Sequence, residues 1–178
     1  RAAAIFRVLT ALTLSEAARL NREIDLVLAV DPRGDLRRWG HVWPQSFRRI
    51  AQVDGSLGRR LNAAIASIDR GPVVVIGADA PGMRAGNLRA AFRALGAADA
   101  VFGPAEDGGF WLIGIARRKR ALNLFANVRW STRHALADTV KSLPAAFSVA
   151  RLGKLRDIDE AKDLKACGPI LRSIRSGR

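Results

Sequence analysis

"PVVVIGAD", residues 72–79, is the stretch of sequence that decides the fold. Three consecutive valines followed by an isoleucine are typical of a strand that is buried on both faces of a parallel sheet. A glycine and an acidic residue follow at once, as expected where a strand ends in a turn. We therefore place this strand at the centre of the sheet.

Apolar periodicity on either side of this strand separates the other elements. It predicts further strands at 25–30, 48–52, 99–105, 110–115 and about 146–152. It predicts helices at 2–13, 14–20 with Ser15 as cap, from the Gly55/Gly58 turn to about 68, 85–95, 117–126, 131–143 and from 159 onward. Strands that alternate with helices indicate a three-layer α/β fold with a mainly parallel sheet and helices on both faces. We expect one domain over residues 1–178, a length that buries about 70% of the unfolded surface.

Charge and cysteine content narrow the class of protein. Thirty Lys and Arg against 16 Asp and Glu give a net charge of +14, which attracts phosphate-bearing partners. The basic residues occur as scattered pairs and one short run, without a recognised nucleic-acid module, so a nucleic-acid partner is not favoured. The single Cys167 and the absence of an apolar run near 18 residues predict a cytoplasmic protein without a membrane span. They indicate no particular oligomeric state.

Asp79 follows the central strand directly. In open α/β sheets ligands bind beyond the carboxyl ends of the strands, which is where this carboxylate is expected. Mg²⁺ and Mn²⁺ take few protein carboxylates and complete their shells with water and substrate phosphates. Asp79 is therefore a candidate metal ligand and catalytic residue, although a helix N-cap or Asx turn explains it equally well.

"GPAEDGGFWLIGI", residues 103–115, places a second pair of carboxylates after the next strand. Glu106 and Asp107 are expected at the same edge of the sheet as Asp79. Gly108 and Gly109 leave the backbone bare, which would allow a ligand to approach it. A hairpin with acidic turn residues is the alternative interpretation.

"LRDIDEAKDL", residues 155–164, is a third acidic cluster. Asp157 and Asp159 lie on the same side of an extended chain, where they repel one another unless a cation or hydrogen-bond donors hold them. This pair is a second candidate set of metal ligands. Capping of the next helix by Asp159 remains an equal alternative.

Two further stretches are candidate binding loops. "QVDGSLGRRLNAAI", residues 52–65, runs from a glycine turn into a helix, so Gly55, Ser56, Gly58 and Arg59 form a candidate phosphate site without the P-loop lysine. "RWSTRHALADTV", residues 129–140, places Ser131 as the N-cap of a helix with Trp130 just before it, and Ser131 and Thr132 could instead bind an anion at the helix start. The two histidines are too few to predict a zinc site or a catalytic triad.

Together "GADAPGM", "GPAEDGGFWLIGI", "VRWSTRHALADTV" and "LRDIDEAKDL" resemble an uncharacterised bacterial family of glycosyltransferase-A-like proteins. Some of its members are labelled arsenosugar-biosynthesis glycosyltransferases, and the family is similar to molybdenum-cofactor and phospholactate guanylyltransferases. The resemblance runs from about residue 1 to 164, and "GPAEDGGFW" is its most specific piece.

The resemblance implies a nucleotide-diphospho-sugar transferase fold with Mg²⁺ or Mn²⁺ and a nucleotide at the carboxyl edge of the sheet. It gives Asp79 the metal position, with Asp157 or Asp159 near the metal and Asp107 on the acceptor side. It places the Gly55–Arg59 loop near the nucleotide. Two departures stand out: Ser56 replaces an acidic residue, and the first strand and its phosphate loop are absent from this sequence.

We therefore expect a metal-dependent glycosyl or nucleotidyl transferase. Its donor would be a nucleotide-sugar or nucleoside triphosphate, and its acceptor a small molecule. Glu106, Gly108, Gly109, Trp130, Ser131 and Thr132 are the candidate substrate-binding residues. The alternative is a non-catalytic protein that keeps the fold and binds a nucleotide or RNA through its positive charge.

Overall fold

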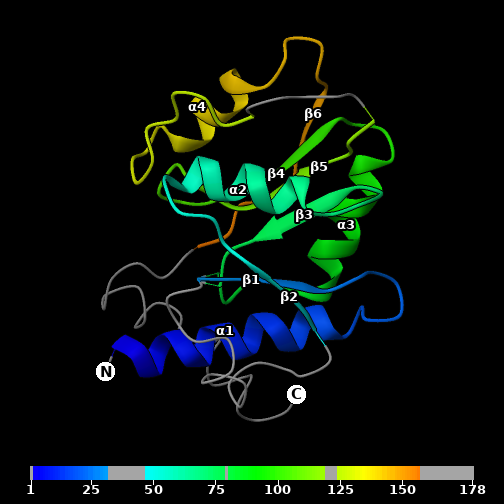
Figure 1. Ribbon diagram of the computed structural model, residues 1–178, viewed down its shortest axis with the longest axis vertical. Coiled ribbons are helices and arrows are strands. Elements are labelled where there is room, and N and C mark those ends of the chain that lie inside the picture. The colour runs from blue at the N-terminus through cyan, green and yellow to red at the C-terminus, as the bar shows by residue number, and fades with distance from the viewer. Residues whose placement is uncertain (1, 32–46, 79, 119–123, 157–178) are drawn as a thin grey trace.

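A computed structural model describes residues 2–31, 47–78, 80–118 and 124–156 of the chain (Figure 1). The helices are α1 (Ala2–Ala18), α2 (Leu57–Ala66), α3 (Ala85–Leu95) and α4 (Ala135–Ser142). The strands are β1 (Val27–Val30), β2 (Arg48–Ala51), β3 (Val73–Ile76), β4 (Ala100–Pro104), β5 (Phe110–Ile115) and β6 (Val149–Arg151). The predicted alternation of strands and helices is confirmed.

The described strands form two sheets. β1 and β2 make a parallel pair, and the larger sheet has the order β3-β5-β4-β6. β5 is antiparallel to both β3 and β4, while β6 is parallel to β4. Three of the four strands in the larger sheet therefore run in one direction, so the carboxyl ends of β3, β4 and β6 lie at a common edge.

Helices cover both faces of the larger sheet, which gives the predicted three layers. Alternate residues of each strand point to opposite faces. Val74, Val101 and Leu112 face a core that includes buried residues of α1 and α3. Their neighbours Val75, Phe102 and Ile113 face a second core, which contains apolar side chains of α2 and α4. In Figure 1, α1 and the β1–β2 pair lie at one end of the molecule and α4 lies at the other.

The placement of residues 72–79 at the centre of the sheet is wrong. Among the described strands β3 has only β5 as a neighbour, so it lies at an end of the larger sheet. Its four residues are only half-buried, whereas the residues of β4 are almost all fully buried. The reason is that β5 turns back after β4 and inserts between β4 and β3, which apolar content alone did not reveal.

Several predicted helix boundaries also need correction. Residues 2–18 form one helix, so Ser15 lies inside α1 and does not cap a second helix. The helix predicted at 117–126 is not found in the described part of that range, where Arg117 has a φ of 59° and residues 124–127 form a turn. The helix predicted from Asp159 lies outside the described residues. Within the described ranges, no helix has the length and apolar character needed to cross a membrane.

Candidate functional site

The connection between β4 and β5, residues 105–109, is a tight turn held by its own groups. The Ala105 N–H donates to the Gly109 carbonyl at 3.0 Å. Oδ1 of Asp107 accepts the Gly109 N–H at 2.7 Å, the arrangement of an Asx turn. The hairpin interpretation of this stretch is therefore correct. Asp107 is exposed, and within the described residues only one of its carboxylate oxygens has a hydrogen bond.

Gly108 packs directly against the chain that precedes α4. Its φ is +92°, and its carbonyl accepts the Leu136 N–H at 3.1 Å. A Cβ at this position would lie 2.7 Å from the Arg133 Cα and would also overlap the Arg133 carbonyl. The bare backbone that we assigned to a ligand thus accommodates the Arg133 backbone. A role for Gly108 or Gly109 in substrate binding stays a prediction.

Leu155 joins three segments at the common edge of the larger sheet. It forms a parallel bridge with Ala105, and its carbonyl accepts the Glu106 N–H at 3.1 Å. Its side chain lies within 3.4 Å of the position that a Cβ of Gly82 would occupy. The turns that follow β3 and β4 and the segment that follows β6 therefore meet here. We call residues 80–83, 105–109 and 152–156 the carboxyl edge.

Glu106 is paired at this edge. The Nε of Arg156 donates to its Oε2 at 2.7 Å, and both side chains are about half exposed. Trp111 provides a second side-chain link between the hairpin and the segment after β6, because its Nε1–H donates to the Gly153 carbonyl at 3.3 Å. The segment after β6 is thus fixed to the hairpin by side chains as well as by backbone.

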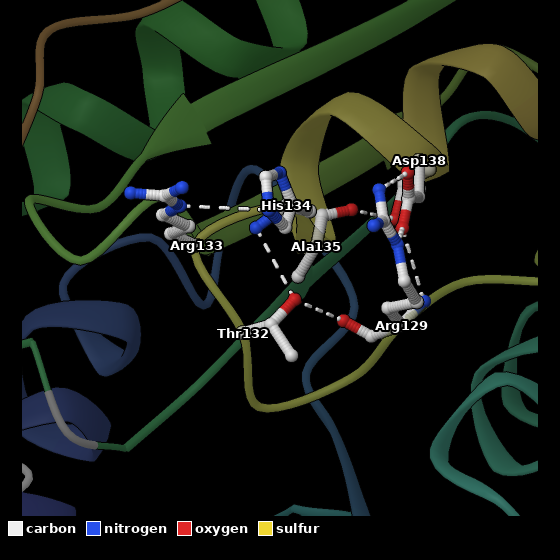
Figure 2. Close-up of polar contacts among 7 residues, drawn as sticks. Arg129, Thr132, Arg133, His134, Ala135 and Asp138 are labelled. Carbon is white, nitrogen blue, oxygen red and sulfur yellow. Dashed lines mark hydrogen bonds and ion pairs between the residues drawn. The ribbon is translucent and has the colours of Figure 1, made fainter.

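The loop 129–134 leads into α4 (Figure 2). The Thr132 hydroxyl donates to the Arg129 carbonyl at 2.8 Å and accepts the His134 N–H at 3.2 Å. Ser131 has a φ of 57°, in the left-handed region. These bonds close the loop on itself.

The prediction that Ser131 caps the following helix is wrong. α4 begins at Ala135, and the N-cap position is taken by His134. An N-cap residue normally has extended backbone angles, which the left-handed Ser131 lacks. The three residues between Ser131 and the helix form a turn that is stabilised by Thr132 instead. Binding of substrate by Ser131 or Thr132 stays a prediction.

Arg129 and Asp138 form a bidentate ion pair across this loop (Figure 2). Nε donates to Oδ2 at 2.7 Å, and NH2 donates to Oδ1 at 2.9 Å. The hydrogen bonds from the Arg129 side chain lower the pKa of Asp138 to about 2, and they raise the pKa of Arg129. Asp138 therefore stays ionised and forms an ion pair with Arg129, so the positive charge of Arg129 is compensated inside the protein.

The loop before α2 is held by the helix that it opens. Ser56 is the N-cap, and its Oγ accepts the Arg59 N–H at 3.4 Å. Gly55 has a φ of +116°, and its carbonyl accepts the Arg60 Nε–H at 3.1 Å. The predicted glycine turn into a helix is confirmed, while its role in binding a nucleotide stays a prediction.

Aromatic rings connect this loop to the hairpin. A Cβ on Gly58 would lie 2.9 Å from the Phe125 Cβ and 3.3 Å from the Trp130 ring. The Trp130 ring centroid is 6.1 Å from that of Phe125 and 6.2 Å from that of Phe110. The candidate nucleotide loop and the candidate substrate residue Trp130 are therefore neighbours, although 71 positions separate Trp130 from Arg59.

The predicted metal ligands Asp79, Asp157 and Asp159 lie outside the described residues. Among the residues that are described, no group of three or more His, Cys, Asp or Glu side chains could hold a metal ion. The metal site stays a prediction. Arg129, Asp138 and Arg156 were missed as site residues, because the chain separates each from its partner by 9 or 50 positions.

Comparison with known proteins identifies a family. The model of a bacterial family described as "Uncharacterized protein conserved in bacteria (DUF2064)" matches residues 13–132, which is more than half of the chain. The matched range includes the hairpin and the Trp130–Thr132 segment. No curated protein matches the chain significantly.

Solved structures match the fold. A "putative nucleotide-diphospho-sugar transferase" from Desulfovibrio desulfuricans G20 is 24% identical with a TM-score of 0.79, over 97% of this chain and 85% of that one. A 4-diphosphocytidyl-2C-methyl-D-erythritol synthase from Anaerococcus prevotii DSM 20548 is 9% identical with a TM-score of 0.67, over 92% and 89%. A homologue of Mycobacterium tuberculosis Rv0371c from Mycobacterium sp. strain JC1 is 16% identical with a TM-score of 0.62, over 92% and 83%. The chain has the nucleotide-diphospho-sugar transferase fold.

Proposed function

We propose that this chain, which belongs to the DUF2064 family, is a metal-dependent transferase of glycosyl or nucleotidyl groups. The donor would be a nucleotide-sugar or a nucleoside triphosphate, and the acceptor a small molecule. The fold is shared with a "putative nucleotide-diphospho-sugar transferase" and with a diphosphocytidyl-methylerythritol synthase. Because fold alone does not determine function, the proposal depends on the carboxyl edge.

The observation that carries the proposal is the meeting of three chain segments at Leu155. Leu155, in the chain after β6, bridges to the turn at Ala105 and packs beside Gly82. Each of the three adjoins one of the acidic stretches of the sequence. Gathering carboxylates at one edge is costly without a cation or hydrogen-bond donors, and a divalent ion on a diphosphate supplies that compensation.

The residues of the proposed site divide into metal ligands, a residue for the acceptor and a loop for the nucleotide. Asp79, with Asp157 or Asp159, would hold Mg²⁺ or Mn²⁺, which neutralises charge on the diphosphate of the donor. Asp107 would orient or deprotonate the acceptor hydroxyl. Its Oδ1 is engaged by the Gly109 N–H, a bond that fixes the direction in which the carboxylate points. The Gly55–Arg59 loop, next to Trp130, would contact the nucleotide.

Asp79→Asn tests the proposal against a matched control, Asp69→Asn. Asp69 is exposed and precedes β3, whereas Asp79 follows the same strand in the sequence. We expect Mg²⁺ with GTP, CTP or UDP-glucose to raise the melting temperature of the wild-type protein, because a ligand that binds the native state stabilises it. The Asp79→Asn protein should lose this shift without a change in its unliganded melting temperature, and the Asp69→Asn protein should keep it.

Two results would contradict the proposal or favour its rival. A wild-type protein that none of these ligands stabilises with either Mg²⁺ or Mn²⁺ would contradict it. The rival to this proposal is a non-catalytic protein that binds a nucleotide or RNA through its net charge of +14. That rival predicts RNA affinity that falls steeply with salt and is unchanged in Asp79→Asn.

A further inference from the structure

The Arg129–Asp138 pair has more contacts than an ordinary surface ion pair. Besides the two guanidinium bonds, Oδ2 of Asp138 accepts the backbone N–H of Arg129 at 3.2 Å. Three donors from one residue therefore converge on one carboxylate, which is only 11% exposed. Bidentate bonding restricts orientation as well as distance. The start of the loop is thereby fixed to α4.

The loop between the two partners is closed by hydrogen bonds of its own. Thr132 bonds both to the Arg129 carbonyl and to the His134 N–H, so both ends of the loop are held by one hydroxyl. Ser131 has left-handed backbone angles, which are unfavourable for a residue with a Cβ. Such angles persist only where surrounding contacts enforce them. The ion pair and the Thr132 bonds are those contacts.

The closed loop in turn contacts the acidic hairpin turn. The Arg133 backbone fills the space beside Gly108, and the Leu136 N–H donates to the Gly108 carbonyl at 3.1 Å. Gly108 lies between Asp107 and Gly109, whose mutual hydrogen bond orients the Asp107 carboxylate. A continuous series of contacts therefore leads from Asp138 through Arg129 and Arg133 to the turn.

A second bidentate pair in the protein lacks this connection. Arg89 donates to Glu23 through Nε at 3.0 Å and NH2 at 2.6 Å, and hydrogen bonding to Arg89 lowers the pKa of Glu23. Both side chains are 48% exposed, and they join α3 to the segment after α1. The two pairs share their chemistry but differ in location, so one is a control for the other.

We propose that Asp138 and Arg129 are positioning residues of the transferase site, which hold the loop 129–134 against the Glu106–Gly109 turn and so set the direction of Asp107. This inference rests on the proposed function, and Asp138 acts through the turn without touching substrate. It goes beyond the assignments made from the sequence, where neither residue belongs to the site.

Hydrogen exchange of the unliganded full chain provides the first test. In Asp138→Asn, the amides of Leu136 and Gly109 should exchange at least about tenfold faster than in the wild type, because local opening controls their exchange. The exchange rate of the Ala116 amide, which donates to the Asp99 carbonyl at the opposite edge of the sheet, should be unchanged. Glu23→Gln should leave all three rates unchanged. Asp138→Glu, which keeps a carboxylate, should restore part of the protection.

The second measurement is the thermal shift produced by GTP or UDP-glucose with Mg²⁺. Asp138→Asn should reduce the shift at least twofold, while Glu23→Gln should retain the wild-type value. If Asp138→Asn unfolds, Arg129→Lys replaces it, since lysine keeps the charge but loses the bidentate geometry. If Asp138→Asn leaves amide exchange unchanged, or speeds exchange without reducing the ligand-induced thermal shift, the inference is wrong while the proposed function is unaffected. Absence of any wild-type ligand shift would overturn the proposed function together with it.

Discussion

The two glycine loops of this protein, which the sequence assigned to a nucleotide and to a substrate, differ in what holds them in place. The loop before α2 is held mainly by its own helix, through the Ser56 cap and the Arg60 bond to Gly55. The turn 105–109 has its own hydrogen bonds but is also held by distant segments, through Leu155, Arg156 and Leu136 of α4. Glycine in the first loop mainly satisfies local geometry, whereas Gly108 also allows two backbones to touch.

Gly108→Ala should produce the largest loss of stability. Its Cβ would overlap the Arg133 backbone while the residue keeps a φ of +92°. Overpacking and a left-handed alanine together cost about 3 kcal/mol. Urea unfolding should show a lower midpoint with an unchanged m value.

Gly71→Ala is the matched control for this change. Gly71 has a φ of +76°, and a Cβ there would meet no atom within 4 Å. It should lose only the backbone contribution, about 1 kcal/mol. Equal losses for the two variants would contradict the packing role assigned to Gly108.

Gly58→Ala, in the first turn of α2, should produce a smaller loss of stability. Its Cβ would lie 2.9 Å from the Phe125 side chain, so overpacking of about 1–3 kcal/mol opposes the gain of up to about 1 kcal/mol from replacing a helical glycine. We expect a net loss near 1 kcal/mol in urea unfolding. Gly86→Ala in α3, where a Cβ meets nothing within 4 Å, should instead stabilise the protein by about 0.5–1 kcal/mol. If Gly58→Ala is instead more stable than the wild type, the Phe125 side chain must shift at little cost to make room for the added Cβ.

Acid titration of the Asp138 pair should give the smallest effect. Its carboxyl has a pKa of about 2 in the folded protein against an ordinary value of 3.8. A lowered pKa stabilises the folded state above 3.8, and this contribution is lost as the pH falls toward 2. The unfolding free energy of the wild type should therefore fall more steeply over this window than that of Asp138→Asn. Parallel curves would contradict the pairing, and high salt should reduce the difference because the pair is near the surface.

Much of the fold could be predicted from local pattern, but the site could be predicted only in part. The apolar runs at 73–76, 100–104 and 110–115 identified strands correctly, since burial of alternate side chains leaves a local signal. The acidic turn is the hairpin that was kept as the alternative interpretation, since Asp-Gly between two strands is a local hairpin signal. Asp138 gave no such signal, because its role depends on an arginine nine positions away across an irregular loop.

The division of the described strands into two sheets was likewise not predicted. In the structure β1 and β2 pair with each other, and among the described residues no strand joins them to β3 by backbone hydrogen bonds. This division of the sheet is a property of strand pairing that no single stretch of sequence displays.

By itself the sequence determined which segments are strands or helices and which turns carry glycine and acid, because these depend on side chains a few positions apart. Only the tertiary structure decided that β5 inserts between β3 and β4, that Gly108 meets Arg133, and that Ser131 lies outside the helix. These outcomes depend on which distant groups satisfy each backbone N–H and carbonyl and fill each space. The partner of each group is therefore determined by the whole folded chain, in which residues far apart in the sequence become neighbours.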